Sequence, residues 1–531
     1  MKKIFLNDEF DKFTRMIDCG ENFAFMRNAD GELAIMEGRA VAAQEGNWKS
    51  PEHVTEIGKA IRKSLDLKGD NVYYAVSCPC CDHRAYYWYA SRVARPENIT
   101  FANLWINKNY PRFKKWFHTL KRDAVLIANY RAKGHQIGNL NILKQYEIDD
   151  DCISFWEKQA SEMIANIQKD YGNRENLLYV VSAGPMSAPI IAALYNNNPN
   201  NCYVDFGSSI DEYYREGLTR PYMTPGTDYA ERNCWMYDPR EVTFDITCVC
   251  NLYKRPESLI RQLDAIENQS LKPKSIILYQ DGISAAKYEV KLNNNMLQHF
   301  EEYRRADSNT GVWSRFKFAM EVAKTKYVCV FDDDTIPGER WLENCMTQML
   351  EHEDEGIYGT NGIMMTDDHT YPSGGYFPVG WKNPVKVCTQ VDFVGHSWFF
   401  KKKYLEYMFD GTEKLQELKY VAEDMCLSIK AKEHGVKTYV PPHPVDDTNL
   451  WGSIPIFGNI FGNAVEALSF SQDNLDLMQK AVAIYKYSGW KPVCVDEPEI
   501  VITARKVIKA EKCRWVILKI RGYVRRKLCI K

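Results

Sequence analysis

The chain carries a short apolar segment, residues 326–331, that runs directly into three carboxylates, Asp332, Asp333 and Asp334. The β-branched and aromatic residues of this segment predict a buried strand. Because side chains alternate along extended backbone, Asp332 and Asp334 are expected on the same side. Two carboxylates at the end of a buried strand make a site for Mg²⁺ or Mn²⁺, and nucleotides bind at that end of an open α/β sheet. Taken alone, the triplet is equally compatible with a solvated acidic turn.

Length and composition limit the class of protein. A chain of 531 residues predicts two or three domains. The net charge of −2 predicts no general affinity for nucleic acid. No apolar run approaches the roughly 18 residues that span a bilayer, and the first residues turn acidic too soon for a secretory signal. We therefore expect a cytoplasmic protein.

Most of the 16 cysteines are scattered, many within apolar runs, which predicts reduced core thiols rather than a disulfide framework. One group is clustered, in residues 78–83 (CPCCDH). Zinc sites need ligand pairs that converge, and no second Cys or His pair with zinc-ribbon spacing follows. We therefore predict a turn near a substrate pocket here, with a metal site as the less favoured alternative.

Two α/β regions are separated by a change in composition. Residues 1–238 alternate strand and helix patterns, which predicts a mostly parallel sheet covered by helices. A stretch rich in Pro, Gly and Asp at 220–242 marks the boundary. A second unit is predicted over 242–490, followed by a basic tail over 491–531. The clearest strand and helix patterns of the first region are 23–26, 72–76, 124–128 and 177–181, and 51–65 and 153–170.

The second region contains five segments whose order is informative. They read ITCVCNLYKRPESLIRQLDAIENQ, SIILYQDG, VFDDDTIP, VGHSWFF and EDMCLSIKAKEHG. On these segments, residues 244–445 resemble the GT-A glycosyltransferases, and among them the inverting enzymes of family 2. The Gln-x-x-Arg-Trp pattern and the transmembrane helices of processive polysaccharide synthases are both absent from the sequence, so we expect transfer of single sugars.

The resemblance implies roles for several residues of this region. Asn251 and Arg255 lie on the loop that leaves the first strand, where the base and ribose would bind. Asp281 would hydrogen-bond the base, although an ordinary Asp-Gly turn is the alternative for this residue. Asp332 would lie near the ribose and the metal, with Asp334 as the firmest metal ligand.

A second acidic pair, Glu423-Asp424, opens a helical pattern that closes at Gly435. Acids are favoured at a helix N-terminus whatever their function. In the family, the second acid of this pair is the general base that deprotonates the acceptor hydroxyl, so Asp424 is the predicted base with Glu423 beside it. We expect the helix start to hold Asp424 ionised.

Three more residues complete the predicted second site. His443 stands where several GT-A enzymes place a third metal ligand, although family 2 often lacks it, and an ordinary loop histidine is the alternative. His396 is expected beside the donor or acceptor sugar. Trp398 is expected either to stack on a sugar or to lie in the core.

The first region also contains an apolar strand pattern followed by carboxylates. An apolar strand pattern ends in Arg27 and the turn Asp30-Gly31-Glu32. Glycine permits close approach to a phosphate, and the two carboxylates can reach one cation. The segment resembles the GT-D glycosyltransferases, whose signature is an arginine, a short stretch and Asp-Gly-Glu. The two residues before Asp30 depart from the usual Phe-Gly.

Two later segments support that resemblance. Residues 177–187 read as a strand that enters a turn at Gly184 and then a helix, whose N–H groups can face a diphosphate. Residues 202–213 read as a strand ending in acids and a glycine. By resemblance, Gly184 lines the pocket, and Asp211 is the predicted base, chosen without a distinguishing signal. The metal and the nucleotide-sugar phosphates would be held by Arg27, Asp30, Gly31 and Glu32.

Positive charge is concentrated at the end of the chain. Residues 501–531 hold eleven Lys or Arg and one acid, Glu511, which alternate with aromatic and aliphatic residues. A basic face combined with an apolar face predicts an interfacial helix on an anionic membrane. A basic helix packed on the protein body or on a partner is the alternative.

Together these patterns predict an α/β fold with two nucleotide-sugar-binding Rossmann-like domains, GT-D then GT-A, and a basic amphipathic helical tail. The expected function is a metal-dependent, bifunctional glycosyltransferase that uses nucleotide-diphosphate sugars, UDP-sugars by default, with Mn²⁺ or Mg²⁺. It would extend a lipid-linked or protein-linked glycan in bacterial surface polysaccharide synthesis, at the inner face of the cytoplasmic membrane. The alternatives are one active transferase with a non-catalytic acceptor-binding domain, and a metal-dependent nucleotidyltransferase or nucleotide-sugar hydrolase.

Overall fold

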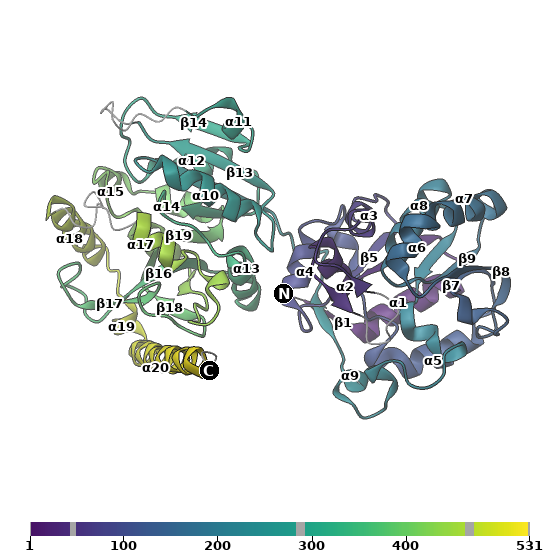
Figure 1. The fold of residues 1–531 in the computed structure, drawn as a ribbon. Coiled ribbons are helices and arrows are strands. Elements are labelled where there is room, and N and C mark those ends of the chain that lie inside the picture. Colours follow the sequence, from purple (N-terminus) through teal and green to yellow (C-terminus); the bar gives the residue numbers. More distant parts are fainter. Residues whose placement is uncertain (1, 43–48, 283–291, 462–471, 529–531) are drawn as a thin grey trace. The chain divides into compact units, whose positions relative to one another are not determined.

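The computed structural model describes residues 2–42, 49–282, 292–461 and 472–528. It divides into two compact units, Met1–Thr243 and Phe244–Lys531 (Figure 1). Each unit has its own sheet that contains parallel strands, so the predicted α/β class is confirmed. The second unit includes residues 491–531, which the sequence sets apart as a tail.

The first unit is built on a sheet of seven parallel strands. Its inner strands are buried on both faces, which explains why they read as continuous apolar runs. All four predicted strand segments are present. In spatial order the strands are β6 (Ile99–Phe101), β5 (Val72–Val76), β2 (Phe23–Asn28), β10 (Cys202–Asp205), β9 (Leu178–Ser182), β7 (Asp123–Asn129) and β8 (Asn141–Ile148).

Helices connect these strands. Capping explains several of their starts, since Thr55, Asp82 and Asp151 each accept a backbone N–H three residues ahead. The helical pattern at 153–170 forms two helices that divide at Gln159. The α-helices are α1 (Leu6–Asp18), α2 (Asp30–Met36), α3 (Glu56–Ser64), α4 (His83–Ala90), α5 (Tyr110–Thr119), α6 (Cys152–Lys158), α7 (Ala160–Tyr171), α8 (Ser187–Asn197) and α9 (Asp228–Glu231).

The strand order places a reversal between β2 and β10. From β2 the chain runs outward through β5 and β6, whereas β10, β9, β7 and β8 fill the other side. Ligands of open α/β sheets bind at the carboxyl ends of strands where the order reverses. Outside this sheet, β1 (Lys3–Phe5) pairs with β11 (Trp235–Tyr237), and β3 (Val41–Ala42) pairs with β4 (Lys49–Ser50).

The second unit has a nine-stranded mixed sheet. Four parallel strands come first, and the antiparallel strand β19 then joins β15 to β16. In order they are β14 (Glu302–Arg305), β13 (Ser275–Gln280), β12 (Ile246–Leu252), β15 (Tyr327–Phe331), β19 (Phe393–Lys401), β16 (Ile357–Met365), β20 (Thr438–Val440) and β18 (Thr389–Val391), while β17 (Tyr376–Gly380) pairs with β16.

The first helix of this unit begins with Pro256, which loses no helical hydrogen bond at that position. The α-helices are α10 (Pro256–Glu267), α11 (Asn294–Leu297), α12 (Ser314–Val322), α13 (Trp341–Glu351), α14 (Tyr404–Phe409), α15 (Glu413–Gln416), α16 (Glu423–Glu433), α17 (Pro455–Phe461), α18 (Gln472–Tyr487), α19 (Val493–Asp496) and α20 (Pro498–Leu528).

The basic tail forms the long helix α20. Val501, Ala504 and Ile508 are buried in the core of the second unit, and Glu511 accepts a hydrogen bond from Val445 N (2.9 Å). The first part of the helix therefore packs on the protein body, as the alternative interpretation has it. Residues 515–517 are about half exposed, and residues 529–531 lie outside the described part. Among the described helices, none combines the length and apolarity that a membrane span requires.

Candidate functional site

The acid triplet of the second unit follows β15 directly. Asp332, Asp334 and His396 each present a ligand atom, and these atoms lie within 4.8 Å of one another. His396 belongs to β19, where its φ of 71° departs from extended geometry and its carbonyl accepts a hydrogen bond from Asp332 N (3.0 Å). Two carboxylates and an imidazole at this spacing can hold a divalent cation.

Helix α10 and its N-cap residue, Arg255, contact the triplet. Gln262 Nε2 donates to the carbonyl oxygens of Asp332 (2.7 Å) and Thr335 (2.6 Å). Arg255 pairs with Asp333 (2.6 Å) and lies 3.7 Å from Asp334. Burial raises the pKa of Asp333 to about 6, against the opposing charge of Arg255. Arg255, predicted to bind the nucleotide, is thus held by the triplet in this structure.

A buried arginine links the triplet to the second acidic pair. Arg315 Nη2 lies 2.9 Å from Asp332 Oδ1 and 3.0 Å from Glu423 Oε1. Only 6% of Arg315 is exposed. Sequence reasoning missed this residue, because nothing in the pattern of α12 distinguishes a buried arginine from a solvated one. The positively charged side chain of Arg315 therefore lies between the two groups of acids in this site.

The acidic pair begins α16, after Ala422 in left-handed conformation (φ 76°). Burial raises the pKa of Glu423 to about 8 and that of Asp424 to about 6. The helix start favours the ionised form of Asp424 while desolvation acts against it, so the pKa of this carboxyl lies above its ordinary value.

Asp281 and Asn251 lie at the ends of adjacent strands. Asp281 follows β13 and is buried, and its Oδ1 accepts hydrogen bonds from Thr310 N and Thr310 Oγ1 (both 2.8 Å). Asn251 lies near the end of β12 and is half-buried. The structure brings both to the carboxyl end of the parallel strands, the end at which β15 delivers Asp332.

Two predicted residues do not reach this site. His443 is fully buried, and its Nδ1 and Nε2 lie 2.7 Å from Pro441 O and 2.7 Å from Thr360 Oγ1, which leaves neither nitrogen for a metal. Burial lowers the pKa of His443 to about 4. Trp398 is 1% exposed and donates to Val394 O (2.5 Å). Trp398 thus belongs to the core, and a sugar-stacking role for it is wrong.

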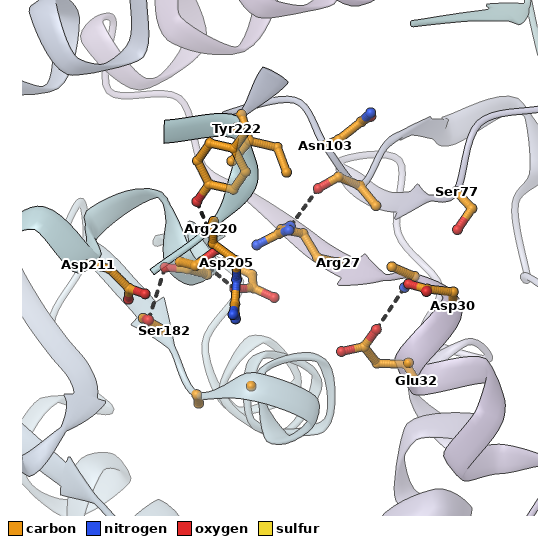
Figure 2. Close-up of a pocket in the computed structure, with 18 of the residues that line it drawn as sticks. Arg27, Asp30, Glu32, Ser77, Asn103, Ser182, Asp205, Asp211, Arg220 and Tyr222 are labelled. Carbon is orange, nitrogen blue, oxygen red and sulfur yellow. Dashed lines mark hydrogen bonds between the residues drawn. The ribbon is translucent and has the colours of Figure 1, made fainter. Parts of the chain in front are cut away.

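The first unit contains a cavity of about 620 Å³ at the carboxyl ends of its strands. Arg27 is the penultimate residue of β2 and donates from Nε to Ala102 O (2.6 Å). Asp205 ends β10, and burial raises its pKa to about 7, with Arg27 acting in the opposite direction. Figure 2 shows Arg27, Arg220 and Asp205 among the residues that line the cavity. The cavity therefore lies where the strand order reverses, and it is lined by two arginines, Arg27 and Arg220, and by the carboxyl group of Asp205.

Asp30, Gly31 and Glu32 form one wall of the cavity (Figure 2). Glu32 Oε2 accepts a hydrogen bond from Ala29 N (2.9 Å), so this carboxylate caps its own helix, α2. Burial raises the pKa of Glu32. Asp30 opens the same helix. Glu32, one of the two acids predicted to share a cation, therefore has a structural role as a helix cap.

Gly184 and Asp211 line another wall. Gly184 has a φ of 54°, which favours glycine, at the turn between β9 and α8. Asp211 is buried, accepts a hydrogen bond from Thr219 Oγ1 (2.9 Å) and lies 3.7 Å from Arg215 Nε. Its carboxylate is thus engaged by its own surroundings. Asp205 was overlooked as a site residue, although it ends a strand pattern just as Asp332 follows one.

Close approach of backbone and side chain marks Gly207, two residues after Asp205. A Cβ added at Gly207 would lie 1.8 Å from Arg27 Nη1, and its φ is 51°. Only glycine therefore lets Arg27 lie across the end of β10. The clustered cysteines adjoin this site as well, since Cys78 and Cys81 line the cavity.

Comparison with known proteins identifies the class of the second unit. Residues 247–409, less than half of the chain, match the model of glycosyl transferase family 2. The second unit therefore contains a domain that matches glycosyl transferase family 2. None of the curated proteins matches the chain significantly.

Solved glycosyltransferase structures are distantly similar. S. aureus TarS is 14% identical with a TM-score of 0.28, over 37% of this chain and 35% of TarS. GalNAc-T7 with UDP, GalNAc and Mn²⁺ is 13% identical with a TM-score of 0.31, over 39% of this chain and 44% of that protein. The chain thus matches less than half the length of either, and at these TM-scores nothing follows for its donor, acceptor or metal.

Proposed function

We propose that the second unit transfers a sugar from a nucleoside diphosphate donor, with a divalent cation held by Asp332, Asp334 and His396. The supporting observation is that their ligand atoms lie within 4.8 Å of one another, while Arg315 ties Asp332 to the acidic pair that starts α16. Burial also raises the pKa of Asp332, because it disfavours the charged carboxylate, and a bound cation would stabilise that carboxylate. Mn²⁺ or Mg²⁺ there supplies Lewis-acid stabilisation of the departing diphosphate.

Asp424 is the proposed general base of an inverting transfer. The acceptor hydroxyl attacks the anomeric carbon as the bond to the diphosphate breaks, and its proton passes to the Asp424 carboxylate. Glu423 is less suited, because its carboxylate already pairs with Arg315 (3.0 Å). Asp281 and Asn251 are proposed to contact the nucleotide from the adjacent strand ends.

The base assignment predicts a large loss on neutral substitution. Asp424→Asn keeps the size and removes the proton acceptor, so kcat should fall by about 10²–10⁴-fold. The pKa of Asp424, raised to about 6, also predicts that wild-type kcat falls as the pH drops through about 6, because the base must be ionised. Initial rates from pH 5 to 8 measure both. Asp410→Asn, an exposed aspartate of the same unit, is the control. Full activity in Asp424→Asn would exclude this base.

The first unit is proposed to be a second, GT-D-type transferase. Its cavity lies where the strand order reverses, and it presents Arg27, Arg220 and backbone N–H groups near Gly184 to a diphosphate. Asp30 is the proposed cation ligand, with Glu32 joining it when its hydrogen bond to Ala29 opens. A non-catalytic acceptor-binding domain remains the second candidate, because Glu32 and Asp211 are both engaged within the protein.

Arg27→Met distinguishes these two candidates. A charge-assisted hydrogen bond contributes about 1.5–3 kcal/mol, so loss of Arg27 should weaken donor binding in the first unit by about 10–100-fold. Calorimetric titration with UDP and with other nucleoside diphosphates measures it on the full chain. Arg112→Met, at an exposed arginine of the same unit, is the control. Weaker nucleotide binding supports the transferase, and unchanged nucleotide binding with weaker glycan binding supports the acceptor module.

The whole chain is proposed to extend a lipid-linked or protein-linked glycan in bacterial surface polysaccharide synthesis. Two sites in one chain raise the effective concentration of the first product at the second site. The exposed apolar residues 515–517, together with the lysines and arginines of α20, support attachment to the surface of an anionic membrane. A screen of nucleotide-sugars against the full chain, with and without Mn²⁺, tests the proposal. Hydrolysis of donors without any need for an acceptor would contradict it.

A further inference from the structure

Four cysteines from distant parts of the sequence meet beside the cavity of the first unit. Cys78, Cys80 and Cys81 lie on the turn after β5, and Cys234 directly precedes β11. Their Sγ atoms all lie within 4.8 Å of one another. Cys78 and Cys80 are 3.4 Å apart, and Cys81 and Cys234 are 3.7 Å apart. Four sulfurs around one Zn²⁺ at about 2.3 Å stand roughly 3.8 Å apart, which matches this spacing.

Neither core packing nor disulfides explains the group. Cys80 and Cys81 are exposed, unlike the core thiols of the second unit. All four cysteines are free, and the Sγ–Sγ distances of 3.4 and 3.7 Å exceed the roughly 2.05 Å of a bond. Multinuclear iron–sulfur clusters spread their cysteines around several metal atoms. Four sulfurs this close together therefore fit a single ion.

Nitrogen donors surround the sulfurs. Asn103 Nδ2 donates to Cys234 Sγ (2.9 Å), Trp235 N to Cys80 Sγ (3.4 Å) and Arg232 Nη1 to Cys81 Sγ (3.5 Å). Such donors stabilise metal-bound thiolates, which carry negative charge, whereas neutral thiols accept hydrogen bonds only weakly. The surroundings are thus built for thiolates.

We propose that Cys78, Cys80, Cys81 and Cys234 bind one Zn²⁺ as a structural site. Four protein ligands leave no open position for substrate, so the ion is structural rather than catalytic. Its position gives it a purpose: Cys78 and Cys81 line the cavity on one side, and Tyr229 and Arg232 line it from the segment that leads to Cys234. Zinc would join these two walls. The proposal does not depend on the activity of either unit.

Metal analysis of the full chain tests the site. Protein expressed with added zinc and purified under reducing conditions should contain about one zinc per chain by mass spectrometry, and little iron. Mercurial titration should release this zinc as four thiols react. Cys234→Ser should lose most of the zinc, and Cys19→Ser, at an exposed cysteine of the same unit, should keep it. Replacement with Co²⁺ should give the absorption bands of a tetrahedral thiolate site.

The first unit should also depend on the ion for stability. Chelation should lower its thermal unfolding temperature, and added Zn²⁺ should restore it, because binding to the folded state alone stabilises that state. If Cys234→Ser does not fold, the zinc content and cobalt spectrum of the wild type still decide the matter. The proposal would be overturned if the purified protein contained no zinc and its unfolding temperature did not change on addition of Zn²⁺. Stoichiometric iron, or a disulfide between any two of the four cysteines, would also overturn it.

Discussion

Alanine in place of Asp334 is expected to lower kcat/KM for sugar transfer by the second unit by about 10³-fold. A bound cation provides several kcal/mol of transition-state stabilisation, and each 1.36 kcal/mol corresponds to a tenfold change in rate. Removing one of three ligands also weakens cation binding, so the Mn²⁺ concentration for half-maximal rate should rise. Initial rates over a range of Mn²⁺ concentrations, with a nucleotide-sugar from the screen, measure both effects.

Two controls separate this loss from damage to the fold. Asp410→Ala removes an exposed aspartate of the same unit and should leave the rate and its metal dependence unchanged. Transfer by the first unit, where it is detected, should survive Asp334→Ala, because each unit has its own sheet and site. Wild-type rates for Asp334→Ala at every Mn²⁺ concentration would place the metal elsewhere. Loss of both activities would point to one composite site.

Strands could be predicted better than their order. Segments such as 177–181 are buried on both faces, and continuous apolar runs reveal that without any alignment. The placement of β10 next to β2 depends on pairing between residues far apart in sequence, about which local pattern is silent. The division between α6 and α7 at Gln159 was missed for a related reason, because neither Gly nor Pro marks it.

Site residues could be predicted where one segment of the chain carries them. The expected proximity of Asp332 and Asp334 is present, although these acids follow β15 in a turn, so that strand alternation is not its cause. Partners that arrive from other elements could not be predicted, as Arg315 and Cys234 show. For His443, local sequence does not reveal that both ring nitrogens already have hydrogen-bond partners, Thr360 Oγ1 and Pro441 O. The raised pKa of Asp424 could not be predicted, because burial is a tertiary property, whereas a helix start is local.

Replacing Arg315 with methionine should destabilise the second unit by about 3–5 kcal/mol. Arg315 is buried between Asp332 and Glu423, and removing one partner of a buried ion pair leaves charge without compensation. At about 2 °C per kcal/mol for a large domain, the unfolding transition of this unit should fall by roughly 6–10 °C. Calorimetry of the full chain without added metal measures it.

A second variant shows whether charge or lost volume is responsible. Arg315→Met combined with Asp332→Asn and Glu423→Gln removes the stranded charges while keeping the side-chain shapes, so much of the lost stability should return. Arg304→Met breaks an exposed ion pair with Glu321 and should change stability by no more than about 1 kcal/mol. Equal destabilisation in the single and triple variants would mean that packing against Trp398, and not charge, gives Arg315 its importance. Recovery in the triple variant would show that the charge of Arg315, by pairing with both Asp332 and Glu423, stabilises the close approach of the two acidic groups.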